Sequence, residues 1–196
     1  TYICNDGSFG ALGHGISDID TKKLLDSDKG LLYGAKIWGI TKARASTVGS
    51  LCGSINYEDD NVIGEINNNS NLGIYGLIPS KNMVDGLIAN YNLKPYEICS
   101  KHNVKIGKAT ILACVTGEVE EYDIEITEIK SNSEGNKGLV IKVTDEELLK
   151  ETGGIVQGMS GSPIIQNNKL VGAVTHVFVR DSTRGYGIFI ENMLKQ

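Results

Sequence analysis

Residues 154–165 read GIVQGMSGSPII, a serine loop between glycines that runs into an apolar segment. Gly158 leaves the backbone unobstructed, so that successive N–H groups can turn toward one point. The N–H groups of Gly158 and Ser160 then form a candidate oxyanion hole. Gly161 keeps the loop tight, and Pro163 begins a strand at a position where no N–H donor is required. The stretch predicts Ser160 as a nucleophile, against the simpler alternative of a glycine-rich turn with an incidental serine.

A serine nucleophile requires a base within hydrogen-bond reach, and the chain offers three histidines. His14 stands between two glycines at the end of an apolar segment, and the glycines clear space around its ring. His176 lies within the predicted strand 170–179, where it faces either the core or a substrate cleft. His102 is in a polar stretch typical of a solvated surface. We therefore predict His14 as the base.

A third group must hold the imidazole in the correct tautomer and stabilise its charged form. Asp18 and Asp20 lie close to His14 in the sequence, and Asp145 precedes a short predicted helix that leads into the serine loop. Each has another explanation, because aspartate is a common helix N-cap and often bonds its own loop backbone. Spacing alone leaves all three open.

Composition excludes several classes of function. The chain has 196 residues and a formal net charge of −5, with no stripe of lysine and arginine, which argues against nucleic-acid binding. No run approaches the roughly 18 apolar residues that a membrane span needs. Its four cysteines include no CxxC pair, so we expect buried free thiols rather than a metal or redox site. No histidine or cysteine pair has a metal-site spacing, and we expect no cofactor.

Most of the chain alternates with a period of two, which predicts short antiparallel strands in one continuous all-β unit. Asn67–Asn69 is predicted as a turn between two of them. Helical signals are few, and they fall at residues 80–90, 144–150 and 191–195. The predicted strands are 2–4, 10–14, 35–40, 49–57, 62–66, 72–78, 109–115, 122–127, 139–143, 162–165, 170–179 and 185–190.

Four segments together resemble the SpoIVB peptidase family of endospore formers, which are relatives of chymotrypsin-like serine peptidases. They are FGALGHGISD at 9–18, TGGIVQGMSGSPII at 152–165, VGAVTHVFV at 171–179 and TRGYGIFI at 183–190. The resemblance implies a chymotrypsin-like double antiparallel β-barrel with few short helices, formed by residues 1–196 as one serine peptidase domain.

The resemblance also implies site residues. By motif, Ser160 is the nucleophile, His14 the base and Asp145 the acid, with Asp18 as the alternative acid. The residue six positions before the serine, Gly154, is expected at the base of the specificity pocket, and His176 is expected to line the substrate cleft. The lack of charge around Gly154 favours a small or apolar substrate side chain.

Members of this family cleave themselves and cut a regulator of an intramembrane protease, which releases processing of a mother-cell sigma factor precursor. They act between the two membranes of the forespore, with a membrane anchor and a PDZ domain upstream that are expected to be missing from residues 1–196. This domain itself is expected to contact neither membrane nor nucleic acid. The alternative is a catalytically silent peptidase fold that only binds peptides, and labelling by a fluorophosphonate distinguishes the two.

Overall fold

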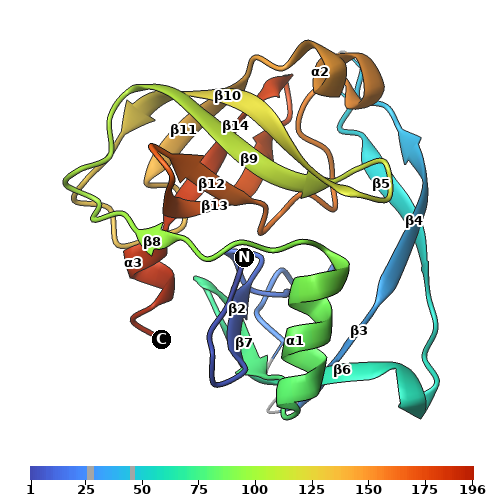
Figure 1. Ribbon diagram of the computed structural model, residues 1–196. Helices are drawn as coiled ribbons and strands as arrows, with labels where there is room; N and C mark the ends of the chain where they lie inside the picture. Colours follow the sequence, from blue (N-terminus) through green and yellow to red (C-terminus); the bar gives the residue numbers. More distant parts are fainter. Residues whose placement is uncertain (26–28, 45–46) are drawn as a thin grey trace.

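Antiparallel strands are the main regular structure of the computed structural model, which describes residues 1–25, 29–44 and 47–196. Figure 1 shows them as two units, a barrel built from the second half of the chain and a smaller sheet built from the first half. The predicted all-β, chymotrypsin-like fold with few short helices is confirmed. Of the two predicted barrels, the second closes through its strand pairings, whereas the described strands of the first half form an open sheet.

The closed barrel has six strands in the order β12-β9-β10-β11-β14-β13, and β12 pairs with β13 to complete the ring. Every pairing in the ring is antiparallel. The two-residue strand β8 adds to β13 in parallel outside the ring. The bounds are β8 Glu97–Ile98, β9 Gly107–Cys114, β10 Val119–Ile129, β11 Leu139–Val143, β12 Pro163–Gln166, β13 Lys169–Phe178 and β14 Asp181–Phe189.

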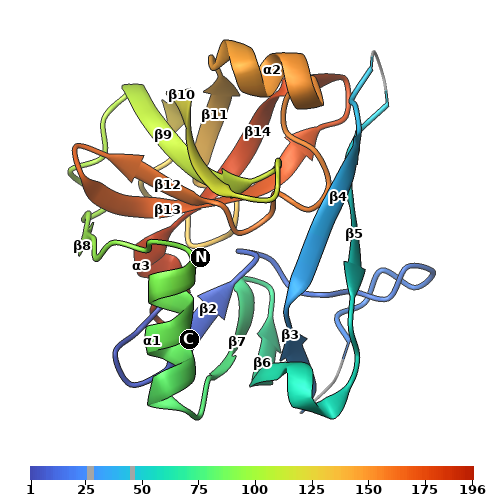
Figure 2. The ribbon, with the colours of Figure 1, turned by 45° about the vertical axis from the view of Figure 1, so that its right-hand side comes forward.

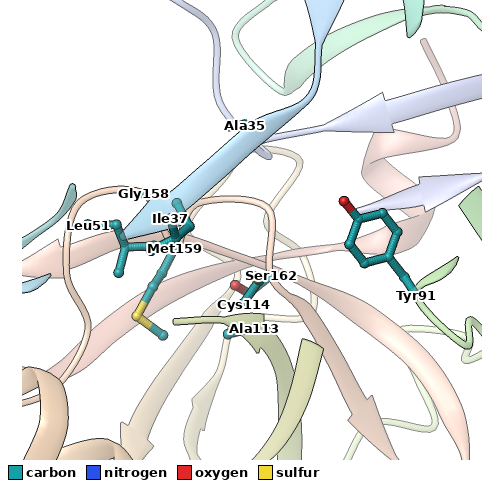
Figure 3. Close-up of a pocket in the computed structure, with 9 residues that line it drawn as sticks. All are labelled: Ala35, Ile37, Leu51, Tyr91, Ala113, Cys114, Gly158, Met159 and Ser162. Carbon is teal, nitrogen blue, oxygen red and sulfur yellow. The ribbon is translucent and has the colours of Figure 1, made fainter. Parts of the chain in front are cut away.

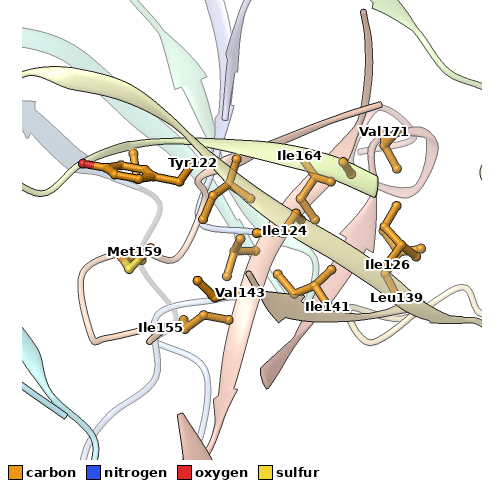
Figure 4. Packing of buried hydrophobic residues seen from close by; sticks show 14 of the residues in the cluster. Tyr122, Ile124, Ile126, Leu139, Ile141, Val143, Ile155, Met159, Ile164 and Val171 are labelled. Carbon is orange, nitrogen blue, oxygen red and sulfur yellow. The ribbon is translucent and has the colours of Figure 1, made fainter. Parts of the chain in front are cut away.

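The barrel encloses the main hydrophobic core. Alternate residues of β10 and β11 point inward, so that Ile124, Ile126, Leu139 and Ile141 are almost completely buried against one another (Figure 4). Their polar neighbours in sequence point outward, as the period of two requires. The buried side chain of Met159 belongs to the same core and ties the serine loop to the barrel interior.

The first half of the chain forms an open five-stranded sheet in the order β1-β2-β7-β6-β3. Its own core is small and centres on Phe9, Ile78 and Val84, the last of these from helix α1. The bounds are β1 Tyr2–Ile3, β2 Ser8–Ala11, β3 Gly30–Tyr33, β6 Val62–Ser70, β7 Gly73–Leu77 and α1 Lys81–Asn90.

A two-stranded ribbon leaves this sheet and runs along the side of the barrel (Figure 2). Its strands are β4, Ala35–Thr41, and β5, Ser50–Ile55, and the single-turn helix η1, Asp59–Asn61, follows β5. The start of β5 reaches the serine loop, because the N–H of Leu51 donates to Gln157 O and the N–H of Gln157 donates to Gly49 O. The ribbon therefore joins the two units beside the candidate site.

A second contact between the units is apolar. Tyr75 of β7 packs with Ala173, Ile188 and Met193, residues that lie on the outer face of the barrel and on helix α3. Helix α3 is Ile190–Met193, and helix α2, Glu146–Thr152, closes the far end of the barrel. The segment before His14 also meets the serine loop where the two units come together.

All three predicted helices are present, whereas the turn predicted at Asn67–Asn69 is wrong. Those residues continue β6, where Asn68 and Asn69 pair with Tyr75 and Ile74, and the chain turns later, at residues 71–72. The sequence also missed β3 and β8. All four cysteines are free thiols, as expected, although only Cys99 is buried. Within the described residues, no helix is long and apolar enough to cross a membrane.

Candidate active site

The serine loop is held at both of its sides. At its start, the buried Thr152 hydroxyl donates to Leu148 O and Gly154 O, which links the end of α2 to the loop. The N–H of Ile155 donates to Ser182 O of β14 over 2.7 Å. With Gln157 paired to β5, the residues before Ser160 form a fixed bridge between the barrel and the ribbon.

Gly158 reverses the backbone two residues before Ser160. Its φ of +102° lies in the left-handed region that favours glycine, and the next N–H, that of Met159, turns back to Val156 O over 3.1 Å. The N–H groups on either side, those of Gly158 and Ser160, donate to no acceptor among the described residues. Two neighbouring free donors around a buried anchor are the arrangement that an oxyanion requires.

The hydroxyl of Ser160 donates to the carbonyl oxygen of Thr175 in β13, over 3.0 Å. No hydrogen bond of the described residues joins it to His14. Catalytic hydrogen bonds are often long or poorly aligned before substrate binds, and they tighten in the complex.

The His14 segment is brought to the serine loop by two glycines. Gly13 has φ +70°, and a Cβ there would lie 2.8 Å from the side chains of Thr175 and Ile188. Gly161 has φ +88°, and a Cβ there would lie 2.8 Å from the N atom of Leu12. The backbone before His14 therefore lies directly against β13, β14 and the residue after Ser160.

Asn69 fixes the segment that follows His14, and the sequence analysis missed it. Its Oδ1 accepts from the N–H of Ile16, and its Nδ2 donates to Ile16 O, each over 2.8 Å. A further bond from Nδ2 reaches Leu25 O over 2.9 Å. A run of three asparagines is typical of a turn, so nothing in the sequence indicated this role. In the structure, the side chain of Asn69 instead holds a neighbouring loop.

His14 is oriented by a local backbone group and by a second ring. Its Nδ1 lies 3.0 Å from Gly15 O, so the neutral tautomer that donates from Nδ1 leaves Nε2 free to accept a proton. The ring centroid of His176 lies 5.1 Å from that of His14, with the planes tilted by 43°. The two histidines that the sequence singled out are neighbours.

A β-bulge turns His176 toward His14. On β13, Val174 pairs with Gly187 and His176 pairs with Tyr186, so Thr175 is an extra residue on that strand. Such bulges re-aim side chains, and they often occur beside active sites. Burial, the neighbouring charge of His14 and that of Lys137 together lower the pKa of His176 to about 4.

Asp145 is engaged elsewhere. It is the N-cap of α2: its Oδ1 accepts from the N–H of Leu148 over 2.9 Å, and its Oδ2 accepts from the N–H of Asp123. No hydrogen bond among the described residues joins it to His14. Its role as the acid stays a prediction, and its contacts favour the N-cap role.

Asp18, the alternative acid, also bonds within its own loop. Its Oδ1 accepts from the N–H and the hydroxyl of Thr21, and these bonds lower the pKa of the Asp18 carboxyl. Neither of the two acids carried forward from the sequence is hydrogen-bonded to His14. No hydrogen bond of the described residues involves the Asp20 carboxylate.

A cavity of about 290 Å³ adjoins the serine loop on the side of the ribbon. It is lined mainly by apolar side chains, and none of the nine lining residues is charged. Gly154 is not among them. It packs against Ser182 O at a distance that leaves no room for a Cβ. The role of Gly154 in substrate binding stays a prediction. Figure 3 shows the lining: Ala35, Ile37, Leu51, Tyr91, Ala113, Cys114, Gly158, Met159 and Ser162.

Among the described residues, no group of three or more histidine, cysteine, aspartate or glutamate side chains is arranged to hold a metal ion. The chemistry available to the site is that of a hydroxyl, an imidazole and two backbone donors, a combination that serves acyl transfer. Serine peptidases use this same set of groups.

Comparison with known families makes the assignment specific. A family model described as SpoIVB peptidase S55 matches residues 1–194, so the chain belongs to this family of serine peptidases. No curated protein sequence matches the chain with significance.

Solved structures with a similar chain path include two forms of one protease, Rv3671c from M. tuberculosis. Its active form has 14% sequence identity and a TM-score of 0.45, and the alignment covers 83% of this chain and 78% of that one. Its inactive form has 14% identity and a TM-score of 0.43, with 76% and 70% covered.

Exchanging Asp145 for asparagine distinguishes its two candidate roles. We expect Asp145→Asn to keep most of the wild-type kcat/KM, because asparagine is also a good N-cap, whereas amide replacement of a triad acid costs about 10⁴-fold. Asp145→Ala should lower the free energy of unfolding by about 1 kcal/mol through loss of the cap. Peptide hydrolysis and urea unfolding measure the two effects, and Asp18→Asn is the parallel test of the alternative acid. A fall in kcat/KM of about 10⁴-fold in Asp145→Asn would instead identify Asp145 as the acid.

Gly13→Ala tests whether the close approach before His14 is required. The added methyl group must displace either Thr175 and Ile188 or the His14 segment, so we expect kcat/KM to fall by about 10²-fold. The matched control is Gly86→Ala in α1, where a Cβ meets nothing within 4 Å and where activity should not change. Equal activities of the two variants would show that His14 is positioned by other contacts.

Proposed function

We propose that the chain is a serine endopeptidase in which Ser160 is the nucleophile and His14 is the general base. The observation that carries this proposal is the pair of unpaired N–H groups, those of Gly158 and Ser160, around a serine that lies beside the histidine segment. Each donor of such a pair is worth about 3–4 kcal/mol in stabilising the transition state.

The proposed reaction has two halves. The Ser160 hydroxyl leaves Thr175 O, gives its proton to Nε2 of His14, and attacks the carbonyl carbon of the scissile peptide bond. The oxyanion accepts from the N–H groups of Gly158 and Ser160 until the C–N bond breaks, and His14 returns the proton to the leaving amine. Water then attacks the ester, His14 takes its proton, and the carboxylic acid product leaves as the proton returns to Ser160.

We infer a preference for a small or apolar substrate side chain next to the scissile bond. The support is the uncharged cavity that Gly158, Met159 and Ser162 share with Ala35, Ile37 and Leu51 of the ribbon. A charged side chain placed there would be desolvated without a partner.

In the cell, we propose that this peptidase cleaves itself and a regulator of an intramembrane protease during sporulation, in the space between the forespore membranes. The support for this finer role is membership of the SpoIVB peptidase family. Membership of this family also supports the proposal that the full-length protein is anchored in a membrane.

A fluorophosphonate probe tests the nucleophile directly. The protein should form one covalent adduct, located at Ser160 by peptide mass analysis, and Ser160→Ala should form none and cut neither itself nor the regulator. Gly86→Ala, at a position in α1 where a Cβ meets nothing within 4 Å, is the control and should label like the wild-type protein. Intact folded protein that neither reacts nor hydrolyses peptides would indicate a silent binding module instead.

A peptide series tests the cavity. Ala35 lies at its exposed rim, so Ala35→Tyr should fill the cavity without disturbing the core. We expect kcat/KM to fall at least about tenfold for peptides with a large apolar residue beside the scissile bond, and much less for alanine peptides. Ala35→Ser is the size-matched control. Fastest cleavage at charged residues would contradict the preference.

A further inference from the structure

The outer face of β14 continues into solvent beyond the point where the first unit covers it. Because side chains alternate along a strand, Ile188, Tyr186 and Arg184 point to the same side of the barrel wall. Ile188 is completely buried in the apolar contact with Tyr75, whereas Tyr186 and Arg184 are only half-buried. His176 of β13 pairs with Tyr186, so this open part of the face begins beside the histidine pair.

Cations and aromatic rings occupy the open part. Lys137 Nζ lies 5.1 Å from the centroid of the Tyr186 ring, and Arg184 Cζ lies 5.2 Å from that of Phe178. The centroids of these two rings are 4.7 Å apart. Lys142 is exposed on β11, the neighbour of β14 in the barrel (Figure 1), where it pairs with Arg184 in the strand register. Together these five residues form what we term the basic face.

The rings place the cations and leave their hydrogen-bond donors open. A guanidinium that stacks on a ring keeps its planar N–H edge free, and that edge matches a carboxylate in a bidentate manner. Among the described residues, none of the three cations of the basic face forms an ion pair. Their N–H groups are therefore available to an anion that comes from outside this part of the chain.

Two carboxylates border the basic face, and each is directed elsewhere or left apart. Asp181 lies at the start of β14, where its Oδ1 accepts from the N–H and the hydroxyl of Thr183. Glu125 of β10 stands opposite Lys142 in the register, and no ion pair joins the two side chains. The chain as a whole is acidic, with 24 Asp and Glu against 19 Lys and Arg, so this group of cations differs in sign from the average.

We propose that the basic face binds an acidic segment of the protein substrate that flanks the scissile bond. The inference rests on the proposed function, in which Ser160 attacks that bond. The nucleophile and the basic face are joined by β13. Thr175 O accepts from the Ser160 hydroxyl, and the next residue, His176, pairs with Tyr186 of the basic face. A bound segment can therefore reach both places at once.

The spacing of the cations sets which substrate residues they meet. Tyr186 and Arg184 are two residues apart on β14, which is about 7 Å, and an extended peptide covers about the same length with two residues. Acidic side chains about two to four positions from the scissile bond are therefore expected to reach Lys137 and Arg184. The residue next to the bond is expected in the uncharged cavity instead, so the two preferences concern different substrate positions.

The physical effect of such a face is on encounter and selection of the substrate. Complementary charges across an interface speed association and discriminate between partners more than they change the reacting groups. The gain should therefore appear in KM and in kcat/KM, with kcat nearly unchanged. Because the cations are exposed or half-buried, salt should weaken the effect.

Two versions of one cleavable peptide test the proposal. They share the residues next to the scissile bond and differ at the flanking positions, which are glutamate in one version and glutamine in the other. We expect wild-type kcat/KM to be about tenfold higher for the glutamate version, and this ratio to approach one at about 0.5 M salt. The double variant Arg184→Gln and Lys142→Gln should bring the ratio close to one already at low salt.

Charge reversal gives a sharper readout than charge removal. With Arg184→Glu and Lys142→Glu together, a peptide version with lysine at the flanking positions should be cleaved faster than the glutamate version. The matched control for the single variant Arg184→Gln is Lys81→Gln, which removes one charge from the exposed first residue of α1 in the other unit. Lys81→Gln should keep the wild-type ratio.

Other results would overturn the inference. Equal cleavage of the glutamate and glutamine versions by wild-type protein would do so, as would a ratio that persists in the double glutamine variant. Vesicles that contain phosphatidylserine test a different occupant. If wild-type protein binds them, the double variant does not, and the peptides are not distinguished, the basic face is a lipid-binding surface and not a substrate site.

Binding to Ser160→Ala separates this inference from the proposed function. Fluorescence anisotropy should give a lower Kd for the labelled glutamate version than for the glutamine version, and the double glutamine variant should abolish the difference. If wild-type protein hydrolyses no peptide and reacts with no fluorophosphonate, the proposed function fails, and the two Kd values still decide what the basic face binds. Equal Kd values would contradict the acidic-segment site.

Discussion

The site depends on one close approach of two backbones. The segment Leu12–Gly13 lies against Gly161 and against the side chains of Thr175 and Ile188, at distances that leave no room for a Cβ on either glycine. This contact places the segment before His14, from the first unit, beside the loop that carries Ser160, from the second. The apolar cluster around Tyr75 and the clamp of Asn69 hold the two units and the histidine segment in that relation.

The serine loop leaves two backbone N–H groups, those of Gly158 and Ser160, without an acceptor among the described residues, beside a well-packed core. Met159 anchors the loop by inserting its side chain into the barrel, and its N–H is satisfied internally by Val156 O. The donors on either side of it are thereby turned outward, where a substrate oxygen can reach them. The free energy cost of unpaired donors is tolerated at this one place because the rest of the loop is bonded to β5 and β14.

Features set by local chemistry were predictable from the sequence. The glycines around Ser160, the helix that begins after Asp145 and the alternating residues of β10 all have short-range causes, and all were found at their predicted places. The contact between His14 and His176 has no such signal, because a bulge depends on how β13 pairs with β14. Asn69 was misread for the same reason: the partners of its side chain, Ile16 and Leu25, are 53 and 44 residues away in the chain. Asp145 is the opposite case, because its surroundings in the sequence already predict a helix N-cap. In the structure, its carboxylate accepts the N–H of Leu148 in that role.

The most direct test of this account is a crystal structure of the protein carrying a peptide boronate on the serine. The account predicts a covalent bond to Ser160 Oγ, a boronate oxygen within hydrogen-bond distance of the N–H groups of Gly158 and Ser160, and His14 between that adduct and the ring of His176. An adduct whose oxygen faces away from Gly158, or one from which the His14 ring points away, would contradict it.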